Sequence, residues 1–162
     1  MRQALVFLLI LLPVYFALSL YYLDKEAFFC PVIYRRDFTI RMDSRGDGIF
    51  ASERSGSRTH KGLDLAAQVG TPVFACRSGR VVAARQNNGM GKFIIIDHGY
   101  DFTTLYGHLS AIYVKENQLV RQGEIIGAVG KTGNANYKEM LPHLHLEIRI
   151  KGVHQNPLDY LE

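Results

Sequence analysis

Two short segments of this 162-residue chain combine histidine with acidic residues at even spacings. The first contains His60 and Asp64, and the second contains His143, His145 and Glu147. Residues two or four apart in an extended chain point to the same face, so each segment would present these side chains together. One imidazole and one carboxylate from the first segment, with one imidazole from the second, would supply three metal ligands. Catalytic zinc sites typically use three protein ligands and keep a fourth position for water.

The histidine left outside such a site would have a separate chemical role. Zinc lowers the pKa of its bound water to about 7, and a neighbouring imidazole can accept the proton or stabilise an oxyanion. Either motif alone is common by chance, so it is their combination that favours a metal site. Glu147 would either orient a ligand imidazole or form an ordinary salt bridge. We expect His98 to be structural and His154 to face solvent.

The elements that must position these residues are predicted to be strands. From Gly56 to Glu162, short runs rich in β-branched and aromatic residues alternate with glycine-marked turns, and no helical period is sustained. The runs follow one another too closely for crossover helices, which favours antiparallel pairing. We therefore predict an all-β domain, a twisted antiparallel sheet folded over itself, with one short helix near Ala111–Lys115. The expected strands are 72–76, 80–84, 92–97, 102–106, 125–129 and 144–150.

Residues 1–24 are predicted to be a transmembrane signal anchor or a signal peptide. Residues 4–23 form an uncharged run of 20 residues, the length that a helix needs to cross a bilayer. The aromatic end of this run suits a membrane interface and favours the anchor. Cleavage after Ala17-Leu18-Ser19, which has a small-x-small pattern, is the competing interpretation. Residues 25–55, rich in turn formers, are predicted to be a connector.

The net charge bears on the kind of partner, and the cysteines bear on metal binding and disulfide formation. A formal net charge of +4 suits approach to an anionic polymer. The basic residues are scattered and are not interleaved with aromatic residues, so no nucleic-acid partner is expected. Cys30 and Cys76 are too far apart in sequence for a CxxC metal motif. They would form one disulfide in an oxidising compartment or remain two thiols.

Beyond these motifs, the sequence resembles the lysostaphin-type (LytM-type) zinc endopeptidases of bacterial peptidoglycan. The matching stretches occur in the family's order and span almost the whole of residues 56–162. They are RTHKGLDLAAQVGTPVFACRSGRVV, FIIIDHGYDFTTLYGHLS, VRQGEIIGAVGKTG and PHLHLEIRIKG. The resemblance implies the family's duplicated hybrid motif as the fold, and it identifies residues 56–162 as a zinc metallopeptidase domain.

The resemblance also implies the roles of individual residues. One zinc ion per chain would be held by His60, Asp64 and His145. His108, in the element Tyr106-Gly107-His108-Leu109, and His143 would be the catalytic residues, acting on the water, the oxyanion or the leaving amine. The implied activity is zinc-dependent hydrolysis of the peptide cross-links of peptidoglycan.

The expected location is the cell envelope, with the domain held outside the cytoplasm by a membrane anchor. Expected partners are peptidoglycan, the cytoplasmic membrane and regulatory proteins. One alternative is a non-catalytic adaptor of the same fold that activates another cell-wall hydrolase, although every ligand position is filled here. Another is a carrier domain, suggested by the glycine-spaced segment 120–130. Residues 134–141, NANYKEML, lengthen a loop that is short in many relatives and should border the groove.

Overall fold

Antiparallel pairing of strands with alternating apolar residues builds most of this computed structural model. The structure describes residues 11–16, 19–21, 23–25, 27–32, 38–54 and 57–161. The largest sheet has eight strands, all of whose pairings are antiparallel. In spatial order they are β1 (Thr39–Ile40), β6 (Leu63–Ala66), β14 (His143–Ile150), β10 (Phe102–Leu109), β9 (Gly91–Asp97), β8 (Gly79–Asn87) and β12 (Leu119–Val120), with β15 (Val153–Gln155) also on β14.

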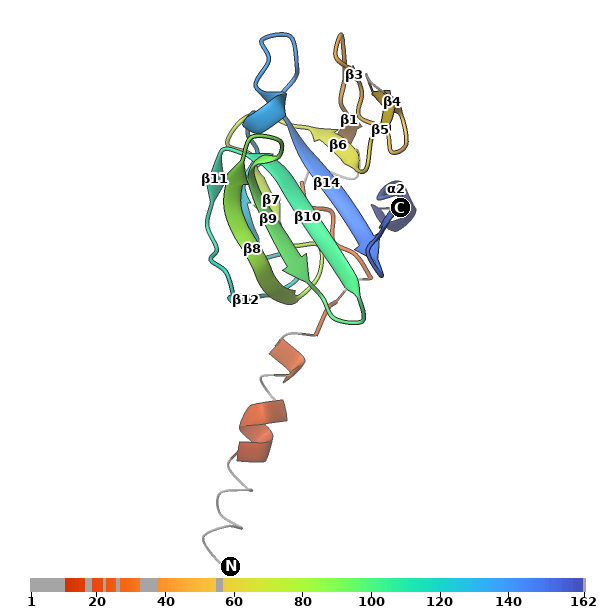
Figure 1. Cartoon of the computed structure of the whole chain (residues 1–162). Coiled ribbons are helices and arrows are strands. Elements are labelled where there is room, and N and C mark those ends of the chain that lie inside the picture. Colours follow the sequence, from red (N-terminus) through yellow and green to blue (C-terminus); the bar gives the residue numbers. More distant parts are fainter. Residues whose placement is uncertain are drawn as a thin grey trace, which may run out of the picture.

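A smaller sheet lies against the curved main sheet (Figure 1). Its order is β11 (Ala111–Ile112), β13 (Ile125–Ala128) and β7 (Pro72–Phe74). Two short hairpins precede β6 in the chain, namely β2 (Met42–Asp43) with β3 (Gly46–Asp47) and β4 (Glu53–Arg54) with β5 (Arg58–Thr59). Within residues 57–161 the remaining elements are a 3-10 turn, η1 (Gly133–Ala135), and a short helix, α2 (Leu158–Leu161). The predicted antiparallel β architecture is thus confirmed.

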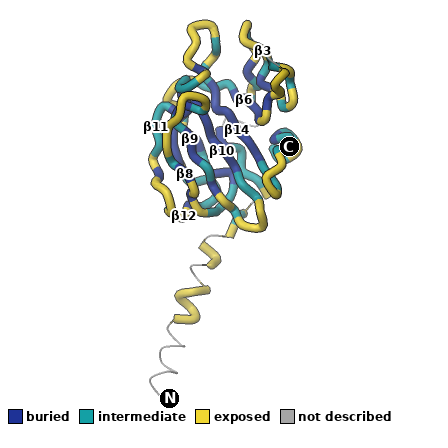
Figure 2. The backbone as a smooth tube through the Cα atoms, in the orientation of Figure 1, coloured by how far each residue is buried: buried dark blue, intermediate teal, exposed yellow. Residues whose placement is uncertain are grey.

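The main core lies between the two sheets and is visible as the dark interior in Figure 2. Alternation decides which residues enter it, since Leu144 and Leu146 of β14 belong to this core and are fully buried. The histidines that separate them therefore face the other side of the sheet. A second, smaller apolar cluster of Ala83, Phe93 and Leu105 lies on that outer side.

The helix expected near Ala111–Lys115 is wrong. Ala111 and Ile112 pair with β13, and the N–H of Tyr113 donates to the carbonyl of Ile126 at 2.9 Å. Cross-strand pairing decides the conformation of this segment, because its own residues have no strong helical pattern.

The segment predicted to be a connector contributes to the domain's framework. Within residues 25–55, β1 adds to the edge of the main sheet by pairing with β6. The backbone N–H of Phe29 donates to the carbonyl of Cys76 at 2.9 Å. Cys30 and Cys76 carry free thiols, and burial raises the pKa of both.

Of the described N-terminal residues, 11–16 lie away from the sheets (Figure 1). Of the expected membrane span 4–23, residues 4–10, 17–18 and 22 lie outside the described residues, while 11–16 and 19–21 are helical. Within the described part of the chain, no helix has the length and hydropathy needed to cross a membrane.

Candidate metal centre

Three predicted ligands, His60, Asp64 and His145, converge at one point. Their ligand atoms lie within 4.8 Å of one another and all three residues are buried. Asp64 Oδ1 lies 2.7 Å from His145 Nδ1 and 3.0 Å from His60 Nε2, and the two ring nitrogens are 3.1 Å apart. Ligands bonded tetrahedrally to zinc at about 2.0–2.1 Å would be about 3.3 Å apart. The donor set and its spacing therefore fit one zinc ion.

Strand pairing places two of these ligands side by side. Asp64 of β6 and His145 of β14 are directly opposite each other in the antiparallel register, and such partners share a face of the sheet. Gly62 allows the segment after His60 to approach β14. A Cβ atom at Gly62 would lie 2.4 Å from the carbonyl oxygen of Leu146 and 2.8 Å from Cε1 of His145. Any larger residue would push the first ligand segment away from the second.

Both ligand imidazoles are oriented by an acceptor on the far edge of the ring. His60 Nδ1 lies 2.9 Å from the carbonyl oxygen of Ile49, and His145 Nε2 lies 3.2 Å from Glu147 Oε1. A carbonyl or carboxylate oxygen only accepts, so these nitrogens carry the protons. The lone pairs of His60 Nε2 and His145 Nδ1 then face Asp64. Three acceptor atoms this close together require a shared cation.

Electrostatics holds the carboxylate of Asp64 ionised. Burial alone would raise its pKa, but the close contacts with His145 and His60 and the nearby positive charge hold the pKa far below its usual range. The other carboxylate oxygen, Oδ2, accepts from Nε and Nη2 of Arg41 at 3.2 and 3.1 Å. Asp64 thus offers a charged oxygen, Oδ1, to the candidate site, while Oδ2 is bound to a cationic side chain.

In the absence of a metal, a proton takes the place of the cation. Burial tends to lower the pKa of His145, but its hydrogen bonds with Asp64 and Glu147 outweigh burial and raise that pKa to about 9. Burial would raise the pKa of Glu147, but its bonds with His145 and Arg149 lower it to about 2. Glu147 therefore has the orienting role that the sequence left open.

The two predicted catalytic histidines lie beside the ligand cluster. The ring centroids of His108 and His143 are 5.0 Å apart, and His108 is 5.6 Å from His145. His143 Nδ1 donates to the carbonyl of Leu141 at 2.7 Å, and His108 Nδ1 donates to that of Thr132 at 3.0 Å. In both rings Nε2 is therefore left as the basic nitrogen.

His108 reaches this position through an irregular backbone. It has a φ of 61°, a left-handed conformation that costs a residue with a Cβ free energy. The register of β10 with β9 shifts between Tyr106 and Leu109, which marks a β-bulge at this point. Such bulges redirect a side chain, here towards the three ligands.

The burial of these two rings keeps them neutral. Burial and the neighbouring His145 and His143 lower the pKa of His108 to about 3. Burial also lowers the pKa of His143, although Asp64 opposes the change. Both imidazoles are therefore proton acceptors at neutral pH rather than cations.

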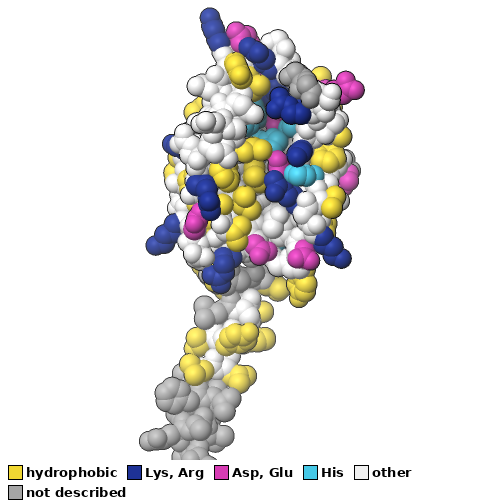
Figure 3. Space-filling view, viewed as in Figure 1, with side chains coloured by type: hydrophobic (Ala, Val, Ile, Leu, Met, Phe, Trp, Pro, Cys, Tyr) yellow, Lys and Arg dark blue, Asp and Glu magenta, His cyan; other side chains and the backbone are white. Residues whose placement is uncertain are grey.

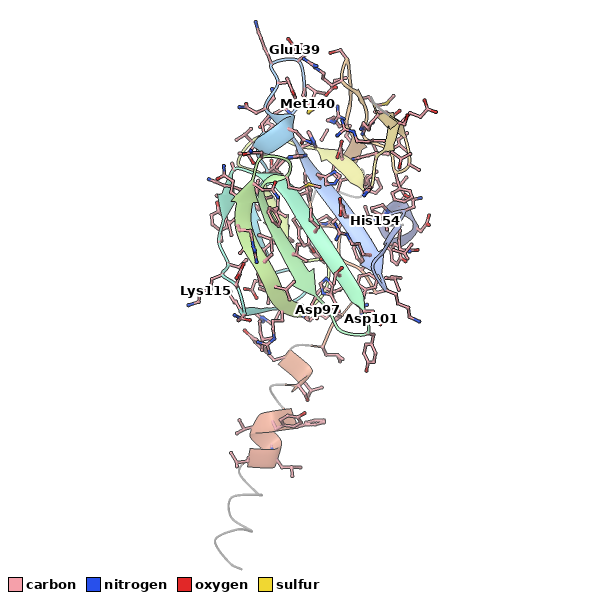
Figure 4. All side chains as sticks on the ribbon, viewed as in Figure 1. Asp97, Asp101, Lys115, Glu139, Met140 and His154 are labelled. Carbon is pink, nitrogen blue, oxygen red and sulfur yellow. The ribbon has the colours of Figure 1, made fainter. Side chains whose placement is uncertain are left out.

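The other two histidines do not join the cluster. His98 Nδ1 donates to the carbonyl of Ser78 at 2.9 Å and Nε2 lies 2.8 Å from Thr104 Oγ1, which agrees with a structural role. The expectation that His154 faces solvent is wrong. The side chain of His154, which Figure 4 labels, is only 23% exposed, and its Nε2 lies 3.3 Å from Glu147 Oε2. Pairing of β15 with β14 brings it there.

Sequence reasoning missed two residues of the site. Arg41 contacts Asp64 but lies 23 positions away in the segment read as a connector. Thr132 contributes only its backbone carbonyl to His108, which no side-chain pattern could have indicated.

The cluster lies in a hollow that is open to the surface, with basic side chains around it (Figure 3). One wall is the loop 134–141, whose tip carries Glu139 and Met140 (Figure 4). Glu139 pairs with Arg45 of the β2–β3 turn at 3.2 Å, so the two loops meet beside the hollow. The outer apolar cluster shares this face of the sheet, because Leu105 is directly opposite Glu147.

Comparison with known proteins gives a consistent result. The sequence model of Peptidase family M23 matches residues 58–157. The peptidoglycan DD-endopeptidase ShyC of Vibrio cholerae is 38% identical over 100 residues, covering 62% of this chain and 22% of that protein. The murein hydrolase activator NlpD of Escherichia coli is 40% identical over 103 residues, covering 63% of this chain and 26% of that protein. The chain thus spans about a quarter of the length of these relatives.

Solved structures share the fold. A zinc containing peptidase from Vibrio cholerae superposes with a TM-score of 0.64 and 29% identity, covering 81% of this chain and 38% of that one. The catalytic domain of lysostaphin from Staphylococcus simulans superposes with a TM-score of 0.61 and 30% identity, covering 76% of this chain and 92% of that one. The resemblance stated from the sequence motifs is confirmed.

Proposed function

Because this chain belongs to Peptidase family M23, we propose that it is a zinc-dependent endopeptidase that hydrolyses peptide cross-links of bacterial peptidoglycan. The observation that carries the proposal is the convergence of His60, Asp64 and His145, whose ligand atoms lie within 4.8 Å of one another. The orientation of both imidazoles by outer acceptors supports a metal role, because such partners fix the ligating nitrogen. One zinc ion per chain fits this donor set.

When bound, a zinc ion polarises the scissile carbonyl and lowers the pKa of a water molecule to about 7. The protein supplies the proton transfers. His143 is the preferred acceptor of the proton from the attacking water, since its strand also carries His145 and its Nε2 is unprotonated. His108, once its Nε2 takes up that proton, would stabilise the oxyanion or deliver the proton to the leaving amine, and these roles of His108 and His143 are interchangeable.

Substrate selection is proposed to use the hollow and the sheet beside it. The apolar cluster of Ala83, Phe93 and Leu105 shares the face of the sheet with the ligands and offers contact to small aliphatic side chains of a peptide. The loop 134–141 borders the opposite side, where its contact with Arg45 limits the width of the approach.

We propose that residues 1–24 hold the domain at the cytoplasmic membrane, with the site on the outer side in the cell envelope. The uncharged run 4–23 supports this location. Peptidoglycan would then be within reach, and regulatory proteins would be natural partners for an enzyme that can damage the wall.

A second candidate function is that of an adaptor that activates another cell-wall hydrolase without turnover of its own. The similarity to a murein hydrolase activator favours it. The complete ligand set and the two neutral histidines beside it favour the enzyme, since an adaptor needs neither.

One experiment separates these functions. The purified full-length protein is incubated with isolated peptidoglycan, with and without a chelator, and the released fragments are identified by mass spectrometry. The enzyme releases muropeptides with cut cross-links, and the chelator stops the release. Zinc-loaded protein that releases nothing alone but accelerates an added hydrolase would support the adaptor and reject the peptidase.

A further inference from the structure

Arg41 is a buried cation beside the candidate metal centre, and it lies upstream of the residues that match the family. Its side chain is 2% exposed, and the family match begins at residue 58. The backbone holds it there, because the N–H of Arg41 donates to the carbonyl of Asp64 at 2.8 Å and its carbonyl accepts from Gly48 at 2.7 Å. The segment after β1 is therefore fastened directly to the ligand strand β6.

The guanidinium of Arg41 contacts one carboxylate oxygen of Asp64, and the other oxygen faces the histidines. Nε and Nη2 of Arg41 both donate to Oδ2, at 3.2 and 3.1 Å. Oδ1 alone faces the ring nitrogens of His145 and His60, at 2.7 and 3.0 Å. Rotation of the carboxylate would break the two bonds from Arg41, so its orientation is fixed.

The far side of the guanidinium is fixed as well. Nη1 of Arg41 donates to Asp43 Oδ1 at 2.6 Å and to the carbonyl of Gly46 at 3.1 Å. The other oxygen of Asp43 accepts from the N–H of Leu141 at 2.8 Å. A continuous chain of hydrogen bonds thus runs from the loop that borders the hollow, through Asp43 and Arg41, to Asp64.

From this geometry we propose that Arg41 is a positioning residue for the metal ligand Asp64. By occupying Oδ2 it would leave Oδ1 as the oxygen that Asp64 offers to the metal, beside the ring nitrogens of His60 and His145. The inference rests on the proposed function, in that His60, Asp64 and His145 bind zinc. Lysine cannot replace Arg41, because an ammonium is a point charge and lacks the planar fork that reaches Asp64 and Asp43 together.

The test compares the full-length protein with its Arg41→Lys variant, which keeps the charge. Zinc affinity is measured by competition with a chromophoric chelator, and the coordination sphere is read from the visible absorption of the cobalt-substituted protein. Loss of a partner that orients a ligand typically weakens metal binding 10–100-fold. We expect Arg41→Lys to bind zinc at least about tenfold more weakly and to show a changed cobalt spectrum. Arg85→Lys is the matched control, because Arg85 is exposed and pairs with the exposed Glu116, away from the candidate site.

A purely structural salt bridge would alter stability but not the cobalt spectrum. A folded Arg41→Lys protein with wild-type zinc affinity and an unchanged spectrum would overturn the proposal. If that variant does not fold, the zinc affinity of Asp43→Asn tests the proposal instead. Its control is Asp101→Asn, at the opposite end of the β domain (Figure 4). Weaker zinc binding in Asp43→Asn supports the proposal, and unchanged binding rejects it. Absence of zinc binding by the wild type would instead refute the proposed function.

Discussion

Glu147 Oε1 lies 3.2 Å from His145 Nε2, on the edge of the ring opposite the one that faces Asp64. His145 therefore lies between two carboxylates, Asp64, which is a proposed metal ligand, and Glu147, which orients the ring. Arg149 and His154 in turn approach the other oxygen of Glu147. The orientation of His145 thus depends on a buried network of hydrogen bonds. The contribution of each residue in this network to zinc binding can be measured by substituting one residue at a time.

Substitution of Glu147 by glutamine should weaken zinc binding about tenfold. The amide oxygen can still accept from His145, but a neutral acceptor makes a weaker hydrogen bond than a carboxylate. Chelator competition measures the affinity, and Glu116→Gln on the surface is the control. Wild-type affinity in Glu147→Gln would show that the carboxylate does not tune the ligand.

Removal of a ligand imidazole should abolish zinc binding. His60→Ala and His145→Ala each leave two protein ligands where catalytic zinc sites typically have three. Metal content after gel filtration, measured by mass spectrometry, should fall from about one zinc ion per chain to near zero. Stoichiometric zinc together with full hydrolysis of peptidoglycan in the His145→Ala protein would reject the ligand assignment.

Removal of either neighbouring imidazole should leave the metal in place. His108→Ala and His143→Ala keep all three ligands, so the zinc content should stay at the wild-type level. Turnover of peptidoglycan should fall by about 10²–10⁴-fold, the usual effect of losing a general acid or base. Loss of zinc from either variant would instead identify that residue as a ligand.

The stability of the metal-free protein should fall as the pH rises from about 6.5 to 9. Hydrogen bonds with Asp64 and Glu147 raise the pKa of His145 to about 9, against 6.5 for an ordinary histidine. In this window the folded chain holds a proton that the unfolded chain has released, so the free energy of unfolding decreases with pH. Urea denaturation across this range measures the slope, which should be much reduced in His145→Asn.

Zinc affinity should show the opposite dependence on pH. Zinc must displace the proton from His145 Nδ1, so binding strengthens by about one log unit per pH unit until about pH 9. Chelator competition at several pH values tests this, with His98→Asn as a control at a histidine outside the site. A pH-independent affinity below pH 8 would contradict proton displacement at His145.

The left-handed backbone at His108 should limit which residues can replace this histidine without a loss of stability. Asparagine tolerates a φ near 61°, whereas a β-branched residue does not. We expect His108→Asn to be more stable than His108→Val by about 1–2 kcal/mol, as measured by urea denaturation of the metal-free proteins. Equal stability of the two variants would mean that the bulge relaxes at little cost.

The sequence was sufficient to predict the six strands expected between residues 72 and 150, and the five proposed site residues lie together in the structure. Alternation in HLHLE decided which side chains face the hollow, and β pairing then placed Asp64 opposite His145. The role of Arg41 was not predicted, because it depends on a contact between segments that are distant in sequence. A single arginine near turn residues is typical of an exposed surface position. The strand at Ala111–Ile112 was missed for the same reason, since pairing with β13 rather than local preference determines it.

The hydrogen bonds of Arg41 also bear on how this domain could be transferred between proteins. A graft of residues 58–157, the part that carries the family signature, would transfer every proposed zinc ligand but leave the guanidinium behind. The recipient would have to provide an equivalent cation on its own preceding strand. The portable unit is therefore longer than its signature, because it must also include Arg41.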